Sequence, residues 1–263
     1  MITDKQLMVN NYSGWWHSID CGDGVVTSGV KTAKVLAQEV ANMQLPPLTG
    51  KTVLDIGAWD GFFSFLAEDL GASKVMALDH VAWSLDVENL FKMGKEGSAV
   101  KNPLAAPGIW KPEALPGKRG FDIVHKIRNS TVEQQVANIM TADLLSIGQF
   151  DVVFFLGVLY HLEEPLTALK RIHALTREMV VIETHAIFLP EYEDNAFLEF
   201  YEGDRLNGDP TNQFGVNANA LKGMCRQVGF RNFKITSPYP PTPDASSDVG
   251  NRLMYRLTLQ AFK

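Results

Sequence analysis

The sequence has little cysteine and no long apolar run, and each absence excludes a class of protein. Cys21 and Cys225 are the two cysteines among 263 residues, so a disulfide scaffold and a zinc cluster are both excluded. No apolar run reaches the roughly 18–20 residues of a membrane span, and Met1–Tyr12 is too polar for a signal peptide. A cytoplasmic, reducing compartment is the default expectation.

Two phosphate-binding signatures are also missing. The chain contains neither the G-x-x-x-x-G-K-[ST] loop of nucleoside triphosphatases nor the G-x-G-x-x-G fingerprint of dinucleotide-binding folds. The composition is that of a globular protein, with 46% hydrophobic residues, 21% charged residues and a net charge of −6. The length favours one large domain or one domain with an elaborate cap.

Strands and helices alternate along the middle of the chain. Strands are predicted at four short apolar runs: 51–57, 74–79, 150–156 and 179–183. Helices are predicted over 62–70 and from Pro165, and an amphipathic helix over 218–228. The alternating run 253–261 predicts a last, antiparallel strand with one wetter face. This pattern predicts an α/β fold with a doubly wound, mostly parallel sheet.

Some segments fall outside the regular pattern and define the expected domain organisation. Residues 1–50 precede the sheet and are expected to form a lead-in and lid. Residues 51–263 are expected to form the catalytic domain, and the aromatic, acidic stretch 185–217 a cap over the acceptor. Such insertions after strand ends are where folds of this class build their sites.

The stretch Val53–Ser64 reads as a strand, a tight glycine turn and the start of a helix. Gly57 and Gly61 form a G-x-x-x-G spacing that lets backbone approach a ligand closely. Trp59 between them is a poor neighbour for a pyrophosphate. Asp55, just before the turn, would repel a pyrophosphate but can face the sulfonium and ammonium of S-adenosylmethionine.

Asp79 ends the second predicted strand, 18 residues after Gly61. A carboxylate there can accept hydrogen bonds from the two hydroxyls of a ribose. Nicotinamide and adenosyl ligands share that ribose, so Asp79 alone does not choose between them.

These motifs resemble those of class I S-adenosylmethionine-dependent methyltransferases. Val53–Ser64 looks like their first motif, Asp79 like their ribose-binding acid, and Thr141–Leu144 like their adenine motif. Phe154–Pro165 and Phe200–Asn212 look like a bacterial subgroup related to the tRNA wobble-uridine (5-hydroxyuridine) methyl- and carboxymethyltransferases. The similarity covers roughly residues 12–262.

The resemblance implies a seven-stranded sheet with an antiparallel last strand and S-adenosylmethionine lying across the strand ends. By position, Ala142 and Asp143 would hold the adenine edge, Trp83 would stack near the adenine, and Tyr160 could close over the methionine moiety. The cofactor-binding residues expected are Asp55, Gly57, Ala58, Trp59, Gly61, Asp79, His80, Trp83, Ala142, Asp143, Leu156, Gly157 and Tyr160.

Methyl transfer needs a placed nucleophile and, for a hydroxyl or ammonium, a base, but no metal. His161 follows the fourth predicted strand and His185 the fifth, so both are candidate catalytic bases, with His161 preferred. The residues expected to bind the acceptor substrate come from the lead-in and the cap: Trp16, His17, Tyr201, Asn207, Asp209 and Asn212.

Charge favours a small-molecule acceptor, as in secondary metabolism, over a nucleic acid. Residues 185–217 hold seven acidic side chains and one basic one, Arg205, and the isoelectric point is about 5.5. Residues 95–128 hold seven basic and three acidic side chains, which keeps a tRNA acceptor open. In the carboxymethyl-transferring relatives an arginine precedes an Asn-aromatic segment, whereas Thr211–Phe214 has none, which favours ordinary S-adenosylmethionine.

Other functions stay open at this point. The first alternative is O-methylation of the tRNA wobble uridine. The same pocket could serve cyclisation or elimination of S-adenosylmethionine. An NAD-dependent oxidoreductase is disfavoured by the G-x-x-x-G spacing, and a non-catalytic module by the intact strand ends. The sequence indicates no membrane partner and leaves the oligomeric state open.

Overall fold

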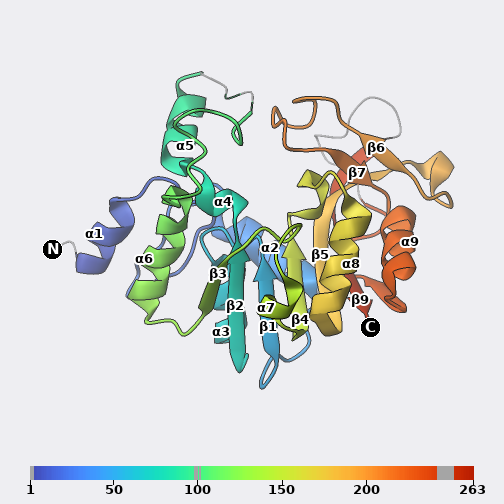
Figure 1. Ribbon diagram of the computed structural model, residues 1–263, viewed down its shortest axis with the longest axis horizontal. Coiled ribbons are helices and arrows are strands. Elements are labelled where there is room, and N and C mark those ends of the chain that lie inside the picture. Colours follow the sequence, from blue (N-terminus) through green and yellow to red (C-terminus); the bar gives the residue numbers. More distant parts are fainter. Residues whose placement is uncertain (1–2, 98–99, 101, 242–251) are drawn as a thin grey trace. The chain divides into compact units, whose positions relative to one another are not determined.

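The computed structural model in Figure 1 describes residues 3–97, 100, 102–241 and 252–263. Lys101, one of the basic side chains counted above, lies outside the described residues. Contacts divide the chain into two compact units: unit 1 is Met1–Ala41 with Pro46–Asn138, and unit 2 is Asn42–Leu45 with Ile139–Lys263. Within the described ranges, no helix is long and apolar enough to cross a membrane.

Unit 1 contains three parallel strands in the order β3-β2-β1. The strands are β1 (Thr52–Ile56), β2 (Lys74–Asp79) and β3 (Glu133–Val136). The α-helices are α1 (Asp4–Asn10), α3 (Phe62–Asp69), α4 (Val81–Ser84), α5 (Val87–Lys95) and α6 (Arg119–Arg128), preceded by the 3-10 helix η1 (Pro116–Lys118). Helix α2 (Ala33–Met43) begins in unit 1 and ends in unit 2.

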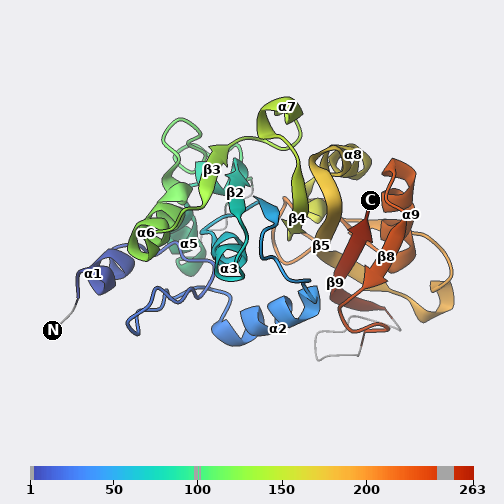
Figure 2. The ribbon, with the colours of Figure 1, turned by 90° about the horizontal axis from the view of Figure 1, so that it is seen from below.

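Unit 2 carries the remaining strands and helices (Figure 2). Its strands are β4 (Phe150–Leu156), β5 (Thr176–Phe188), β6 (Leu198–Phe200), β7 (Phe214–Val216), β8 (Asn232–Ile235) and β9 (Leu253–Phe262). Its α-helices are α7 (Leu144–Ile147), α8 (Pro165–Leu175) and α9 (Ala218–Val228), and its 3-10 helices are η2 (Leu159–His161) and η3 (Pro190–Tyr192). Strands β4 and β5 are parallel, and β9 runs antiparallel to β5 from Met179↔Phe262 to Phe188↔Leu253.

The predicted fold class is confirmed: strands and helices alternate, β2 pairs parallel with β1 and β3, β4 pairs parallel with β5, and the last strand is antiparallel. Strand β4, apolar apart from Asp151, is almost fully buried, as a strand covered on both faces must be. The wetter face predicted for β9 is wrong for its second half. Leu257–Ala261 are all buried, and the polar positions among them are paired inside unit 2: the Thr258 N–H donates to Ser237 Oγ, and the Gln260 amide donates to the carbonyls of Met43 and Gln44.

The segment 185–217 is less irregular than the sequence suggested. Strand β5 continues to Phe188, so His185 lies inside this strand and not after it, which corrects the sequence-based placement. Ala186 pairs with Tyr255 of β9 on one side and with Val216 of β7 on the other. Strand β6 then pairs antiparallel with β7. The segment therefore extends the sheet of unit 2 beyond the end of β4.

Candidate cofactor and active site

The glycine turn after β1 is built from three left-handed residues: Gly57 (φ 82°), Trp59 (φ 51°) and Gly61 (φ 89°). A Cβ atom at position 61 would lie 2.5 Å from the ring of Phe65 and 2.7 Å from that of Phe121. Position 61 therefore requires glycine for its conformation and for space. Trp59 adopts the same region without that freedom, so neighbouring groups must hold it there.

Asp79 holds this turn from the end of β2. Its carboxylate accepts hydrogen bonds from the backbone N–H of Trp59 (2.9 Å) and of Ala82 (3.0 Å). Only 4% of Asp79 is exposed, and burial raises the pKa of its carboxyl group. Trp83 supports the same turn, because its indole N–H donates to the carbonyl of Trp59 at 2.6 Å and its side chain is fully buried. The ribose role of Asp79 and the adenine role of Trp83 stay predictions.

Asp55 is also an internal group in this structure. The hydroxyl of Ser64 donates to its Oδ2 at 2.6 Å, and 2% of the residue is exposed. Burial raises the pKa of Asp55 to about 6. The carboxyl group thereby joins β1 to α3, and the predicted contact with a cationic ligand stays a prediction.

Sequence reasoning missed Asp60, which attaches the lead-in to the turn. Asp60 Oδ2 accepts the backbone N–H groups of Trp16 and His17, both at 2.9 Å, and its Oδ1 contacts His17 Nδ1. Asp60 is 1% exposed. The Trp16 ring stacks on Trp59 with centroids 4.8 Å apart and planes inclined by 14°. Both predicted acceptor residues of the lead-in thus touch the glycine turn. The one sequence signal for this role of Asp60 was an acidic residue inside the glycine turn.

Two buried polar atoms of unit 1 are suited to bind a polar ligand. His80 Nδ1 and Trp59 Nε1 are buried without a hydrogen-bond partner among the described residues. They flank Asp79, at the carboxyl ends of β1 and β2, and Ala58 lies buried between Gly57 and Trp59. Since unpaired buried polar atoms are costly, a nucleoside-containing cofactor such as S-adenosylmethionine fits this turn.

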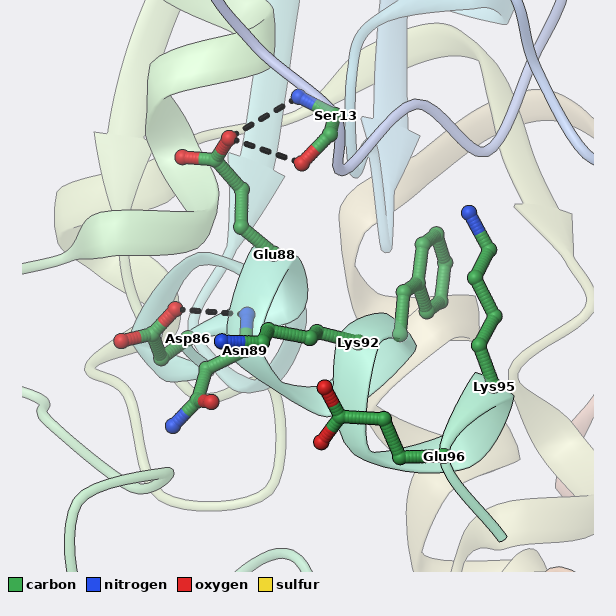
Figure 3. A pocket seen from close by; sticks show the side chains of 8 residues that line it. Ser13, Asp86, Glu88, Asn89, Lys92, Lys95 and Glu96 are labelled. Carbon is green, nitrogen blue, oxygen red and sulfur yellow. Dashed lines mark hydrogen bonds between the residues drawn. The ribbon is translucent and has the colours of Figure 1, made fainter.

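An open pocket of about 630 Å³ lies beside α5, lined by residues that include Ser13, Phe91, Lys92 and Lys95. Figure 3 shows Glu88 turned toward Ser13, whose N–H and hydroxyl both donate to it at 2.9 and 3.0 Å. Lys92 and Lys95 point in different directions, so they do not converge on one anion.

In unit 2, a short chain of hydrogen bonds runs from Asp209 through Thr211 to His161. The Thr211 hydroxyl donates to Asp209 Oδ1 at 2.7 Å and lies 2.9 Å from His161 Nδ1. Because the hydroxyl has one proton, Nδ1 must be the donor toward Thr211, and Nε2 keeps its lone pair. Burial lowers the pKa of His161, with Asp209 acting in the opposite direction. A neutral imidazole with a free Nε2 is suited to act as a base.

His185 has a different environment. Its Nε2 lies 3.0 Å from the hydroxyl of Tyr201, which is 4% exposed. Burial, together with Arg256 and Arg252, lowers the pKa of His185 to about 4. The ring nitrogen that a base would use is already paired, so His161 is the better candidate of the two.

Sequence reasoning also missed Arg256 on β9. Its guanidinium carbon lies 4.8 Å from the ring centroid of Tyr160, and its Nε and Nη2 bind Glu183, the latter at 2.5 Å. The side chain is 40% exposed. Gly157 (φ 72°) follows Leu156 and has no closer neighbour for a Cβ than Arg256 Nη2 at 3.6 Å. The strand register His185↔Arg256 brings the arginine here, and no sequence motif signals it.

The remaining predicted residues of unit 2 serve local structure. Asp143 caps α7, because its Oδ1 accepts the N–H of Leu145 at 3.0 Å, while the carbonyl of Ala142 binds Arg171. Asn212 is 4% exposed and donates to the carbonyl of Leu206 at 2.9 Å. Asn207 forms a left-handed turn residue (φ 58°). Two predicted acceptor residues of the 185–217 segment lie at the candidate bases: Asp209 reaches His161 through Thr211, and Tyr201 contacts His185.

Comparisons with known proteins agree with this architecture. A family model described as "Methyltransferase domain" matches residues 31–235. The tRNA U34 carboxymethyltransferase of Helicobacter pylori strain G27 is 41% identical over 201 residues, which is 75% of this chain and 62% of the relative. The tRNA U34 carboxymethyltransferase of Campylobacter jejuni strain RM1221 is 26% identical over 189 residues, 72% of this chain and 52% of the relative. The chain thus matches little more than half the length of these curated relatives.

Among solved structures, the N-terminal domain of EvdMO1, crystallised in the presence of SAH and D-fucose, has a TM-score of 0.62. It is 16% identical, and the match covers 99% of this chain and 97% of that domain. At this identity the likeness concerns the fold alone.

Proposed function

The chain belongs to the methyltransferase domain family, and from that premise we propose that it transfers a methyl group from S-adenosylmethionine to the hydroxyl of a wobble uridine in tRNA. The family match covers residues 31–235. The 41% identity to a tRNA U34 carboxymethyltransferase is the observation that carries the acceptor assignment. The relatives favour tRNA over the small-molecule acceptor that the charge distribution suggested.

The acidic stretch 185–217 is a weaker obstacle to RNA than its sequence indicates. Glu199 forms an ion pair with Arg252 at 3.0 Å. Asp209 is engaged by the N–H and the hydroxyl of Thr211. Counting charges along the chain misses such pairing, because Arg252 is distant in sequence. Part of this acidity is therefore internal to unit 2.

The proposal assigns cofactor binding and proton transfer to different residues. When bound, S-adenosylmethionine supplies a methyl group activated by its sulfonium. The turn around Gly57 and Gly61, with His80 beside it, would hold the cofactor in unit 1. In unit 2, His161 Nε2 would accept the proton of the uridine hydroxyl, and the Thr211–Asp209 chain would keep the imidazole in the required tautomer.

A second candidate, carboxymethyl transfer, is favoured by Arg256. The relatives are named carboxymethyltransferases. The guanidinium of Arg256, which lies over the Tyr160 ring and binds Glu183, supplies a cation. The Thr211–Phe214 segment, however, lacks an arginine. Glu183 already neutralises that cation, and for this reason we place methyl transfer first.

One assay tests both candidates. Purified protein is incubated with tRNA carrying 5-hydroxyuridine at the wobble position and with either S-adenosylmethionine or its carboxylated form. Nucleosides are then analysed by mass spectrometry. A methoxyuridine product supports the proposal, and a carboxymethoxy product that requires the carboxylated donor replaces it by the second candidate. No modified uridine with either donor would overturn both.

A further inference from the structure

The stretch from Pro210 to Pro241 is unusual in a chain of net charge −6. It contains four basic side chains and no carboxylate: Lys222, Arg226, Arg231 and Lys234. Arg226 and Arg231 are exposed, and Lys222 is half-buried. None of the four forms an ion pair with another described residue. Their charge is therefore available to an external anion.

Three of these cations gather on one side of unit 2. Lys222 and Arg226 are four residues apart on α9, so they lie on one face of the helix, about 6 Å apart along its axis. The Arg226 guanidinium lies 5.3 Å from the ring centroid of Phe233, which ties the helix to β8. Arg231 begins the connection into β8 and is held by its N–H to the Phe262 carbonyl at 2.8 Å. Figure 2 shows α9 and β8 side by side.

The basic segment 95–128 of unit 1 differs in this respect. Its cations are mostly neutralised by ion pairs within the unit: Lys111–Asp86, Lys118–Asp122, Arg119–Glu88 and Arg128–Asp69. The segment that looked basic in the sequence is thus largely balanced once folded. Lys222, Arg226 and Arg231 are not balanced in this way by other described residues. The ring of Phe233 also lies beside the guanidinium of Arg226.

We propose that Lys222, Arg226 and Arg231, the α9 patch, form a docking surface for the phosphate backbone of the RNA acceptor. This inference rests on the proposed function. Helix α9 begins two residues after β7 ends, and the patch starts about 6 Å along it. Gln213, just before β7, donates its N–H to the carbonyl of Tyr160 at 2.8 Å, so α9 follows a segment that lies beside His161. An RNA whose wobble nucleotide reaches His161 can therefore continue along α9. Cations that form no ion pair with a described residue release counterions when a phosphate backbone binds, which supplies affinity without sequence specificity.

The test is the salt dependence of tRNA binding. The triple variant Lys222→Glu, Arg226→Glu, Arg231→Glu is compared with the wild type by filter binding of unmodified tRNA over a range of salt concentrations. We expect the affinity at low salt to fall by about 10-fold or more and the log–log salt slope to decrease by roughly 2. Affinity for S-adenosylhomocysteine and the circular dichroism spectrum should be unchanged, because the patch lies outside the cofactor turn.

A matched control reverses three other exposed cations, which also form no ion pair with described residues: Lys34, Lys126 and Lys170. This variant carries the same net charge, so it separates a local contact from a general loss of attraction. Lys234 lies on the face of β8 opposite to Phe233, and its single reversal should have a smaller effect than that of Arg226. Equal losses in the control and patch variants would overturn the inference.

The two proposals can fail separately. If wild-type protein modifies tRNA but the patch variant binds and modifies it equally well, the α9 surface is wrong and the function stands. If the wild type binds tRNA through the patch, with the expected loss in the variant, but modifies no uridine, the docking surface stands and the wobble-uridine reaction is wrong. If wild-type protein binds no tRNA at low salt, or binds anionic lipid vesicles through the patch instead, the inference is overturned.

Discussion

The two regions that carry the candidate chemistry use their polar side chains in opposite ways. Around the glycine turn of unit 1, Asp55, Asp60 and Asp79 are all buried and bind groups of their own chain. In unit 2, no described residue binds His161 Nε2, and the side chain of Arg256 is 40% exposed. A carboxylate beside a binding turn can therefore serve to shape the turn. His161 is available as a base because no described residue binds its Nε2, whereas Arg256 is exposed but already paired with Glu183.

The largest expected effect comes from breaking the attachment of the lead-in. Asp60→Ala leaves the N–H groups of Trp16 and His17 and the His17 ring without their acceptor in a buried site. We expect a loss of about 3–5 kcal/mol in the free energy of unfolding, measured by chemical denaturation. Asp23→Ala, at an exposed ion pair with Lys5, should cost far less than Asp60→Ala. Similar losses in both variants would contradict the role assigned to Asp60.

A second change tests how tightly the turn is packed. Gly61→Ala forces a Cβ atom against the rings of Phe65 and Phe121 and strains a residue with φ 89°. We expect a loss of about 3 kcal/mol of stability and weaker binding of S-adenosylhomocysteine in calorimetry. Gly108→Ala has similar backbone strain (φ 81°) but no atom within 4 Å, so it should cost about 1 kcal/mol. Equal costs would show that strain alone decides.

The third change addresses unit 2. His161→Gln removes the candidate base, and we expect turnover to fall about 100-fold while cofactor affinity stays constant. Because burial lowers the pKa of His161 below its ordinary 6.5, the neutral base persists into mildly acidic solution. The acid limb of the rate profile should therefore lie below pH 6.5 in the wild type. His185→Gln serves as the comparison and should leave that limb in place.

The smallest expected effect concerns Asp55. Its pKa is raised from 3.8 to about 6 in the folded protein, so the fold favours the protonated form. The resulting stabilisation is present below pH 3.8 and is lost as the pH rises through about 6. An asparagine side chain cannot ionise, so the stability of Asp55→Asn relative to wild type should improve by roughly 2 kcal/mol between about pH 4 and 7. Denaturation at several pH values measures this, and a constant difference would be inconsistent with a raised pKa.

Strands and helices with a strong apolar pattern could be predicted from the sequence, and others could not. The run 150–156 became β4 and the stripe 218–228 became α9 as expected, because burial on both faces or on one face leaves a periodic signal. Strand β3, Glu133-Gln-Gln-Val136, was missed because it is polar and largely exposed. It forms through its hydrogen bonds to β2, which leave no mark in residue type.

Local sequence patterns were enough to predict the glycine turn, the alternation of strands and helices and the two histidines worth testing, because these depend on local conformation and local apolar spacing. Tertiary structure alone decided that Asp60 binds the lead-in, that Arg256 lies over Tyr160 and that Arg252 neutralises Glu199. Each of these contacts joins residues tens of positions apart through strand register or loop packing. Electrostatic pairing depends on distance in space, which a linear count of charges does not contain.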